Sequence, residues 1–305
     1  MSEGGGSLER ARGGAVSPPT DRVVSVVELL AARGAPCTIA QVADTLRLSR
    51  STVAAILGAL DARGWVRREI DLAYRLGPGL IGPGAAARRT MGVLPGLDDA
   101  LARLSAQVDC GAGLAVVTSN DLTFLAVDPG RGRLPAGIAT GWTVPLRAPA
   151  GAAVIAFTDQ ARQRAWLGTA APERRPELAA ALHCIQSTGV GVWGIAAADP
   201  GMLDVLAEVV EHLAEDPTRH ALRERVRTLL AGISGRPYNA SDLAGDEALP
   251  ISYLVAPVFD AAGRAVWELQ IGPLKSSASR EERAHYIEQL TRTARELDTR
   301  TGVNT

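Results

Sequence analysis

The chain has 305 residues, of which 47% are hydrophobic and 21% charged, and its net charge is −1. This composition is typical of a globular protein with a sizeable core and excludes an intrinsically disordered chain. The length predicts two domains. The three cysteines form no close pair and the four histidines lack metal-ligand spacing, so we expect no disulfide framework, no metal site and no cofactor.

The first 19 residues are rich in glycine, serine and proline. Such a composition is typical of a disordered segment, and the segment lacks the apolar run of a signal peptide. No apolar run elsewhere approaches the roughly 20 residues that span a bilayer. We therefore predict a disordered segment over residues 1–19 and a cytoplasmic protein that has no membrane partner.

Positive charge is concentrated near the N-terminus. Residues 1–90 carry a net charge of +4, whereas residues 91–305 carry −5. This asymmetry predicts an anion-binding N-terminal domain on a neutral to acidic body. Arginine supplies nearly all of the cations, and Lys275 is the only lysine, which fits a GC-rich genome and is by itself weak evidence for nucleic-acid binding.

Three helices and a hairpin are predicted within residues 20–82. The first helix ends at Arg33, and the second begins after Thr38, which can form a capping box with Gln41. The third begins after Ser49, and two short strands, WVRREI and AYRL, follow it. Helix, short turn, helix and hairpin together predict a winged helix-turn-helix domain.

Polar and basic side chains of this domain are the candidate DNA contacts. The N-terminal turn of the third helix is polar and cationic, and this part of a recognition helix meets base edges. Arginines on the hairpin suit contacts with phosphates. The residues predicted to contact DNA are Arg22, Thr38, Arg47, Ser49, Arg50, Ser51, Thr52, Arg67, Arg68 and Arg75.

The segment from Val23 to Gly82 resembles the DNA-binding domain of IclR-type bacterial transcription regulators. The resemblance rests on ELLAARG, on TIAQVADTLRLSRSTVAAILGALDARGWV and on the hairpin exit YRLGPGLI. In one departure, Ala54 and Ala55 follow Ser-Thr-Val, where the family usually has long polar residues. Base readout is then expected to rest on residues 49–52, with the alanine methyl groups near thymine methyl groups.

Residues 83–93 are predicted to form a linker, and residues 94–305 to form a second domain. The order of its elements resembles the GAF-like effector domain of the same regulators, an α+β fold with helices on an antiparallel sheet. The resemblance also implies a homo-oligomer, either a dimer or a tetramer. The main predicted elements are helices at 94–107, 149–157, 159–168, 173–187 and 279–299, strands at 113–119, 122–127, 251–259 and 264–271, and a helical insertion near 195–235.

In that family the effector lies between a helix rich in small residues, which corresponds to residues 149–157 here, and the late hairpin, which corresponds to the strands at 251–259 and 264–271. By the resemblance, Tyr253, Leu269 and Ile271 stand where the family has a cysteine and two serines. Because so apolar a wall would solvate a carboxylate poorly, we expect a small-molecule effector more apolar than a small keto acid, with its polar head on backbone N–H groups. The predicted effector-binding residues are Trp142, Ala150, Gly151, Ala152, Asp242, Tyr253, Leu269 and Ile271.

One alternative to effector binding and one alternative to transcription regulation stay open. Side chains could fill the pocket, so that no effector exists. The chain could also be a ligand-binding or protein-interaction module whose winged helix serves dimerisation. Uncharged alanines on the third helix favour this second alternative.

Motifs for catalysis are weak. Residues 189–194 match GxGxxG, but a helix precedes them and no acid follows on a second strand, so we predict a strand with closely packed glycines. Residues 232–235 lack the final glycine of a nucleophile elbow and favour a helix end. We therefore predict a transcription regulator that binds pseudo-palindromic double-stranded DNA and is not an enzyme. An enzyme that uses the GAF-like cavity is the remaining alternative.

Overall fold

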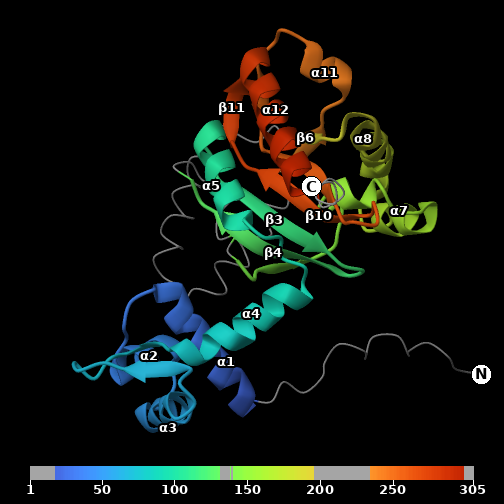
Figure 1. Ribbon diagram of the computed structural model, residues 1–305. Coiled ribbons are helices and arrows are strands. Elements are labelled where there is room, and N and C mark those ends of the chain that lie inside the picture. Colours follow the sequence, from blue (N-terminus) through green and yellow to red (C-terminus); the bar gives the residue numbers. More distant parts are fainter. Residues whose placement is uncertain (1–17, 131–137, 139, 196–233, 299–305) are drawn as a thin grey trace, which may run out of the picture. The chain divides into compact units, whose positions relative to one another are not determined.

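The computed structural model describes residues 18–130, 138, 140–195 and 234–298. They form two compact units, one up to Ala87 and one from Arg88 onward (Figure 1). Of the predicted disordered segment, residues 1–17 lie outside the described residues, and so do residues 196–233 of the predicted insertion. None of the described helices is long and apolar enough to cross a membrane.

The first unit is a winged helix-turn-helix, as predicted. Thr38 and Gln41 form the expected capping box, and the Ser49 hydroxyl accepts the backbone N–H of Thr52 at 3.1 Å. Its elements are α1 (Pro18–Arg33), α2 (Ile39–Leu46), α3 (Arg50–Asp61), β1 (Val66–Arg68) and β2 (Tyr74–Leu76).

One apolar core joins these elements. The buried face of α3 contributes Val53, Leu57 and Leu60, and the wing closes the core with Val66 and Tyr74. The backbone of Tyr74 also exchanges two hydrogen bonds with Cys37, of 2.8 and 2.7 Å, which attach the wing to the segment before α2. The buried face of α3 is thereby fixed, and its opposite face is left exposed.

A short helical turn, η1 (Pro78–Leu80), leads from the wing into α4 (Ile81–Thr90). None of the α4 side chains is buried, and Ile81 is 72% exposed. The helix contains two glycines and a proline, which are poor helix formers. Among the described residues, α4 thus contributes no buried side chain to either core.

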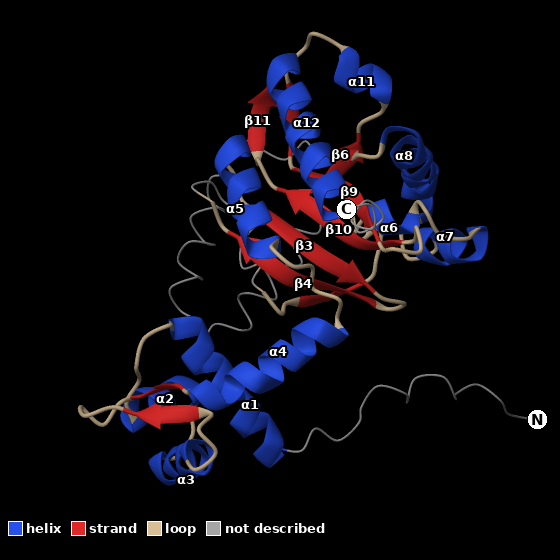
Figure 2. Ribbon diagram, in the orientation of Figure 1, coloured by secondary structure: helices blue, strands red, loops and turns tan. Residues whose placement is uncertain are grey.

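The second unit is built on a seven-stranded antiparallel sheet, which confirms the α+β prediction (Figure 2). Its strand order is β5-β4-β3-β10-β9-β6-β7, so the hairpin predicted last lies at the centre. The elements are α5 (Leu97–Val108), β3 (Ala112–Val117), β4 (Asp121–Asp128), β5 (Thr143–Pro145), α6 (Ala152–Ile155), α7 (Gln160–Leu167), η2 (Pro172–Arg174), α8 (Arg175–Thr188), β6 (Gly191–Ile195), β7 (Ser234–Pro237), α11 (Ala240–Ala244), β8 (Leu249–Ile251), β9 (Tyr253–Phe259), β10 (Ala265–Ile271), β11 (Lys275–Ala278) and α12 (Arg280–Leu297).

Helices cover both faces of this sheet. On one face, α5 and α12 bury Leu104 and Leu290 against strand residues such as Leu114 and Leu254. On the other face, α6, α7 and α8 bury a second layer that includes Trp193 on β6. Side chains alternate between the two faces along each strand, so every second residue of a strand packs in the same layer.

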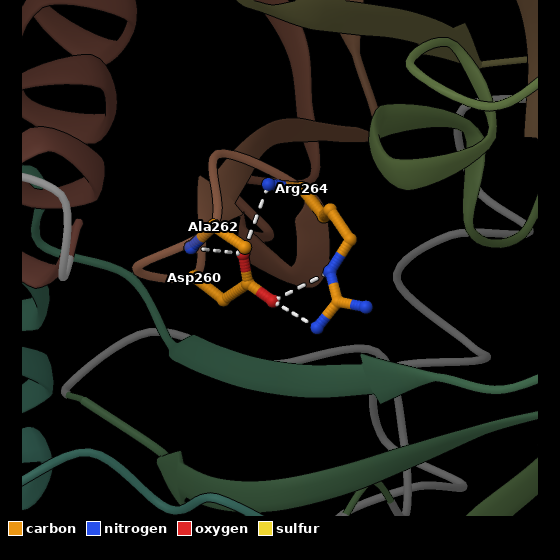
Figure 3. A network of polar contacts seen from close by, with 3 residues as sticks. All are labelled: Asp260, Ala262 and Arg264. Carbon is orange, nitrogen blue, oxygen red and sulfur yellow. Dashed lines mark hydrogen bonds and ion pairs between the residues drawn. The ribbon is translucent and has the colours of Figure 1, made fainter.

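The turn between β9 and β10 is organised by one carboxylate (Figure 3). Asp260 accepts the backbone N–H groups of Ala262 and Arg264, each at 2.9 Å, and also binds the Arg264 guanidinium. These hydrogen bonds hold the pKa of Asp260 below its usual value. The turn sets the register of the two central strands.

Two glycine motifs have different outcomes. The predicted strand with closely packed glycines is confirmed as β6, because a Cβ on Gly191 would lie 2.4 Å from the Trp193 ring. The helix end predicted at residues 232–235 falls on residues 232 and 233, which lie outside the described residues, and on Ser234 and Gly235, which begin β7. The strand predicted at 251–259 is interrupted at Ser252, and β8 instead pairs with β11 in a separate two-stranded sheet.

Gly58 tests whether the exposed face of α3 is under structural constraint. A Cβ at Gly58 would meet nothing within 4 Å, so Gly58→Ala is expected to raise the free energy of unfolding by about 1 kcal/mol through helix propensity. Denaturant unfolding measures the change. Gly64→Ala is the matched control: it has no close contact either, but its φ of +68° disfavours alanine, so it should destabilise. Stabilisation by both substitutions would contradict this account.

Candidate nucleic-acid interface and effector region

The N-terminal turn of α3 is held together by its own hydroxyl groups. The Ser49 Oγ lies 3.0 Å from the Ser51 Oγ and 2.7 Å from the Thr52 Oγ1, besides capping the helix. Arg50 is exposed and forms no ion pair with another described residue. Arg50 and the exposed Ser51 are therefore the side chains of this turn that are best placed to reach a ligand.

Between Ser51 and Asp61, the exposed positions of α3 carry only small side chains. These are Ala54, Ala55, Gly58 and Ala59, all of them exposed. Small side chains let the helix backbone approach a groove closely, but they offer methyl groups and no hydrogen-bond donors. Direct readout by these four positions is therefore restricted to apolar contacts.

The arginines predicted on the wing differ in the partners of their guanidinium groups. Arg67 and Arg75 lie opposite each other on β1 and β2, and both are exposed. Arg75 forms an ion pair with Glu69, and the Arg68 guanidinium lies 5.9 Å from the centre of the Tyr74 ring. Arg67 has no ion pair within the described part of the chain, so its charge is the most available on the wing.

The other predicted DNA contacts belong to the same unit. Arg22 on α1 is exposed, and so is Arg47 in the turn before α3, which adopts a φ of +53°. Thr38 is half-buried, and its hydroxyl is used in the capping box of α2. The structure thus leaves the arginines exposed and engages Thr38 in holding the fold.

The predicted effector residues divide into groups around α6. Tyr253 stacks on Trp193 with ring centres 5.0 Å apart and an interplanar angle of 2°, in the layer that contains Ala152. Trp142 stacks on Phe124 at 5.9 Å, at the edge of the adjoining cluster that contains Ala150. Gly151 caps α6 with a φ of +77°.

Leu269 and Ile271 lie on the opposite face of the sheet, which corrects their prediction as effector contacts. Both are fully buried against α5 and α12. In the run Trp-Glu-Leu-Gln-Ile, apolar residues alternate with polar ones, and the apolar positions follow the larger core. Matching by family position missed this alternation, which was visible in the sequence.

Asp242 has a structural role among the described residues. It forms a capping box with Asn239 at the start of α11, and its carboxylate lies 3.6 Å from the Arg236 guanidinium. The following loop is held by Arg283 of α12, a buried cation whose guanidinium donates to the carbonyl groups of Gly245 and Glu247 at 2.6 and 2.8 Å. Among the described residues, the partners of the Asp242 carboxylate are thus Asn239 and Arg236, and neither belongs to α6.

Glu268 is the residue of the α6 side that sequence reasoning missed. It is 2% exposed, and its Oε2 accepts the backbone N–H of Ala153 at 2.9 Å. Its direct neighbours on the flanking strands are Ala115 and Pro257, which carry no charge. A backbone N–H group of α6, where we predicted the polar head of a ligand, is therefore occupied by a carboxylate of the protein itself.

Burial raises the pKa of Glu268 to about 7, and hydrogen bonds from the backbone of Ala153 and Gly151 oppose the rise. A folded-state pKa above the unfolded value of about 4.3 means that the folded protein binds more protons between these two pH values. The contribution of this group to stability is therefore complete below about pH 4 and is lost as the pH rises toward 7.

Glu268→Gln tests this linkage. Relative to the wild type, the variant should gain up to about 3 kcal/mol in free energy of unfolding between about pH 5 and pH 8, because an amide does not titrate. Denaturant unfolding at several pH values measures the difference, and Glu281→Gln, at an exposed position of α12, controls for loss of one carboxylate. A difference that does not change with pH would show that Glu268 does not titrate in this range.

A surface cleft of about 450 Å³ lies elsewhere in the second unit. It is lined by the end of α5 and the start of α12, including Cys110 and Tyr286, and the ion pair between Lys275 and Glu282 lies at its wall. None of the predicted effector residues lines it. Within the described ranges, no group of three or more His, Cys, Asp or Glu residues could hold a metal ion.

Comparisons with known proteins agree with this architecture. Residues 19–69 match the family model of the IclR helix-turn-helix domain, and no curated protein matches the chain. The crystal structure of IclR from Thermotoga maritima is 15% identical, with a TM-score of 0.58, over 94% of this chain and all of that one. HmgR from Pseudomonas aeruginosa is 19% identical, with a TM-score of 0.53, over 93% of this chain and 97% of that one.

A third similar structure contains a small molecule. It is an IclR homologue from Microbacterium hydrocarbonoxydans in complex with 4-hydroxybenzoate, 16% identical, with a TM-score of 0.52, over 92% of this chain and 98% of that one. At these identities the likeness shows the fold. Residues 19–69 therefore match the IclR helix-turn-helix domain, and the described chain shares the fold of these IclR-type structures.

Proposed function

We propose that the protein is a ligand-responsive transcription regulator that binds pseudo-palindromic operator DNA as a homo-oligomer. The observation that carries the proposal is the exposed cationic edge of an IclR helix-turn-helix domain, with Arg50 on α3 and Arg67 on the wing. In this class of domain, the recognition helix enters the major groove and flanking cations hold the backbone. A dimer would set two such helices on successive half-sites.

The exposed helix α4 supports the oligomer. An isolated helix without a buried side chain is marginal in water, and this one exposes Ile81 to solvent. Packing against a second copy would stabilise it by burying that surface. We assign α4 to the dimer contact. Analytical ultracentrifugation would distinguish a dimer from a tetramer by its mass.

Two kinds of variant test the division of labour on DNA. Arg67→Ala should weaken binding to operator and random duplexes alike and reduce the salt slope by about one unit, because it removes a phosphate contact. Arg50→Ala or Ser51→Ala should instead change base preference, at about 1–3 kcal/mol for each base pair read. Fluorescence anisotropy titrations at several salt concentrations measure both quantities.

Equal effects of the two kinds of variant on specific and random DNA would contradict this assignment. Failure of the wild type to bind any duplex would favour the alternative, a ligand-binding or protein-interaction module whose winged helix serves dimerisation. The small, uncharged side chains at the exposed positions 54, 55, 58 and 59 of α3 are the observation on which that alternative depends.

We further propose that a small-molecule effector binds on the α6 side of the sheet, near Trp142, Ala152 and Tyr253. Aromatic stacking supplies an apolar wall there. Glu268 faces the same layer, and above its pKa of about 7 its buried carboxylate would repel a second carboxylate. Both features support a ligand more apolar than a small keto acid, and binding would shift the equilibrium between DNA-competent and incompetent arrangements.

Isothermal titration calorimetry tests the ligand class with matched probes. Among pyruvate, glyoxylate, 4-hydroxybenzoate and its uncharged counterpart 4-hydroxybenzamide, we expect the amide to bind most tightly, because it is aromatic and carries no charge to desolvate. Tight binding of pyruvate or glyoxylate, with none of the aromatic probes, would contradict the proposal.

A further inference from the structure

The tip of the wing carries two exposed apolar side chains. Ile70 is 101% exposed and Leu72 is 58% exposed, and together with Ile81 they are the most exposed large hydrophobic residues in the described part of the chain. Single exposed apolar residues are common on protein surfaces. Here two of the three most exposed lie two residues apart on one projecting turn, and their proximity calls for an explanation.

The turn that carries them is well ordered by hydrogen bonds. The backbone N–H of Glu69 donates to the Ala73 carbonyl at 2.8 Å, and that of Leu72 donates to the Glu69 carbonyl at 3.1 Å. The Asp71 carboxylate accepts the N–H of Ala73, also at 3.1 Å. Leu72 adopts a φ of +66°, a conformation that non-glycine residues rarely take. The two side chains are thus projected by a defined turn.

The wing carries one more cation than anion. Glu69 is paired with the Arg75 guanidinium, whereas Asp71 accepts only a backbone N–H group and keeps its negative charge at the tip. Behind the tip, exposed arginines occupy both strands, at Arg67 and Arg68 on β1 and at Arg75 on β2. The hairpin therefore ends in two apolar side chains on either side of one carboxylate, with Arg67 and Arg68 behind them and free of ion pairs among the described residues.

We propose that Ile70 and Leu72 enter the minor groove of the operator as an apolar wedge at a base step. The inference rests on the proposed function, because it assigns DNA as the partner of the wing. Proteins that bind the minor groove insert isoleucine and leucine side chains in this way and bend the duplex. The flanking arginines would bind the phosphates on either side of the groove.

The wedge would also supply specificity that α3 lacks. Pyrimidine–purine steps unstack at the lowest energetic cost, so a protein that kinks DNA selects them without reading base edges. The outer face of α3 offers mainly methyl groups. We therefore expect flexible steps at fixed distances outside the sequence that Arg50 and Ser51 contact.

The test compares a wing-tip variant with the wild type on a duplex that the wild type binds. Ile70→Ser with Leu72→Asn removes both apolar side chains, and asparagine tolerates the positive φ. We expect affinity to fall about tenfold and the bend measured by circular-permutation gels to decrease, with the salt slope unchanged because no phosphate contact is lost. Fluorescence of 2-aminopurine at the candidate step should lose its unstacking signal.

Two controls separate this effect from others. Phe157→Ser removes an apolar residue of the second unit, 39% exposed, and should leave affinity and bend unchanged. Arg67→Ala should reduce the salt slope, which the wing-tip variant should not do. An unchanged affinity and bend in the wing-tip variant would overturn the wedge, and so would a change in oligomeric state with an unchanged bend. A wild type that binds no duplex would instead overturn the proposed function itself.

Discussion

The position of α3 depends on the apolar core that Val53, Leu57 and Leu60 share with α1, α2 and the wing. Removing a side chain such as that of Leu57 would cost about 2–5 kcal/mol, against a total stability of about 5–15 kcal/mol for a typical domain. Because the apolar face of α3 packs in this core, the side chains of its exposed face are not needed for packing. The hydrogen bonds between Cys37 and Tyr74 attach the wing to the segment before α2, and α3 and the wing share one core.

In the second unit, the decisive feature is a sheet that is buried on both faces. Most of the inner layers are apolar, and Glu268 is a buried carboxylate among them that meets only backbone N–H groups. Its position at the start of α6 links the central strand to the layer where we propose that the effector binds. A ligand that enters this layer must therefore be compatible with the carboxyl group of Glu268. This one position on β10 would thus restrict the chemical class of the ligand.

Local features of the fold were predictable from the sequence, because their cause lies within a few residues. The capping residues Thr38, Ser49 and Ser279 each stand at the helix start that their side chain determines. The face that a strand residue occupies is a different matter. Leu269 was assigned by its place in a family pattern, although alternation along the strand places it on the face opposite to Glu268. Strand order and the isolated pairing of Cys37 depend on contacts between distant segments, and no local pattern indicates them.

The most direct test of the central claim is selection of bound DNA from a random duplex pool at physiological ionic strength, followed by sequencing. The account predicts enrichment of an inverted repeat whose half-sites lie about one helical turn apart, because two recognition helices related by a two-fold axis meet successive major grooves. Retention of DNA without a shared motif, or no retention at all, would contradict the claim that this protein is a sequence-specific regulator.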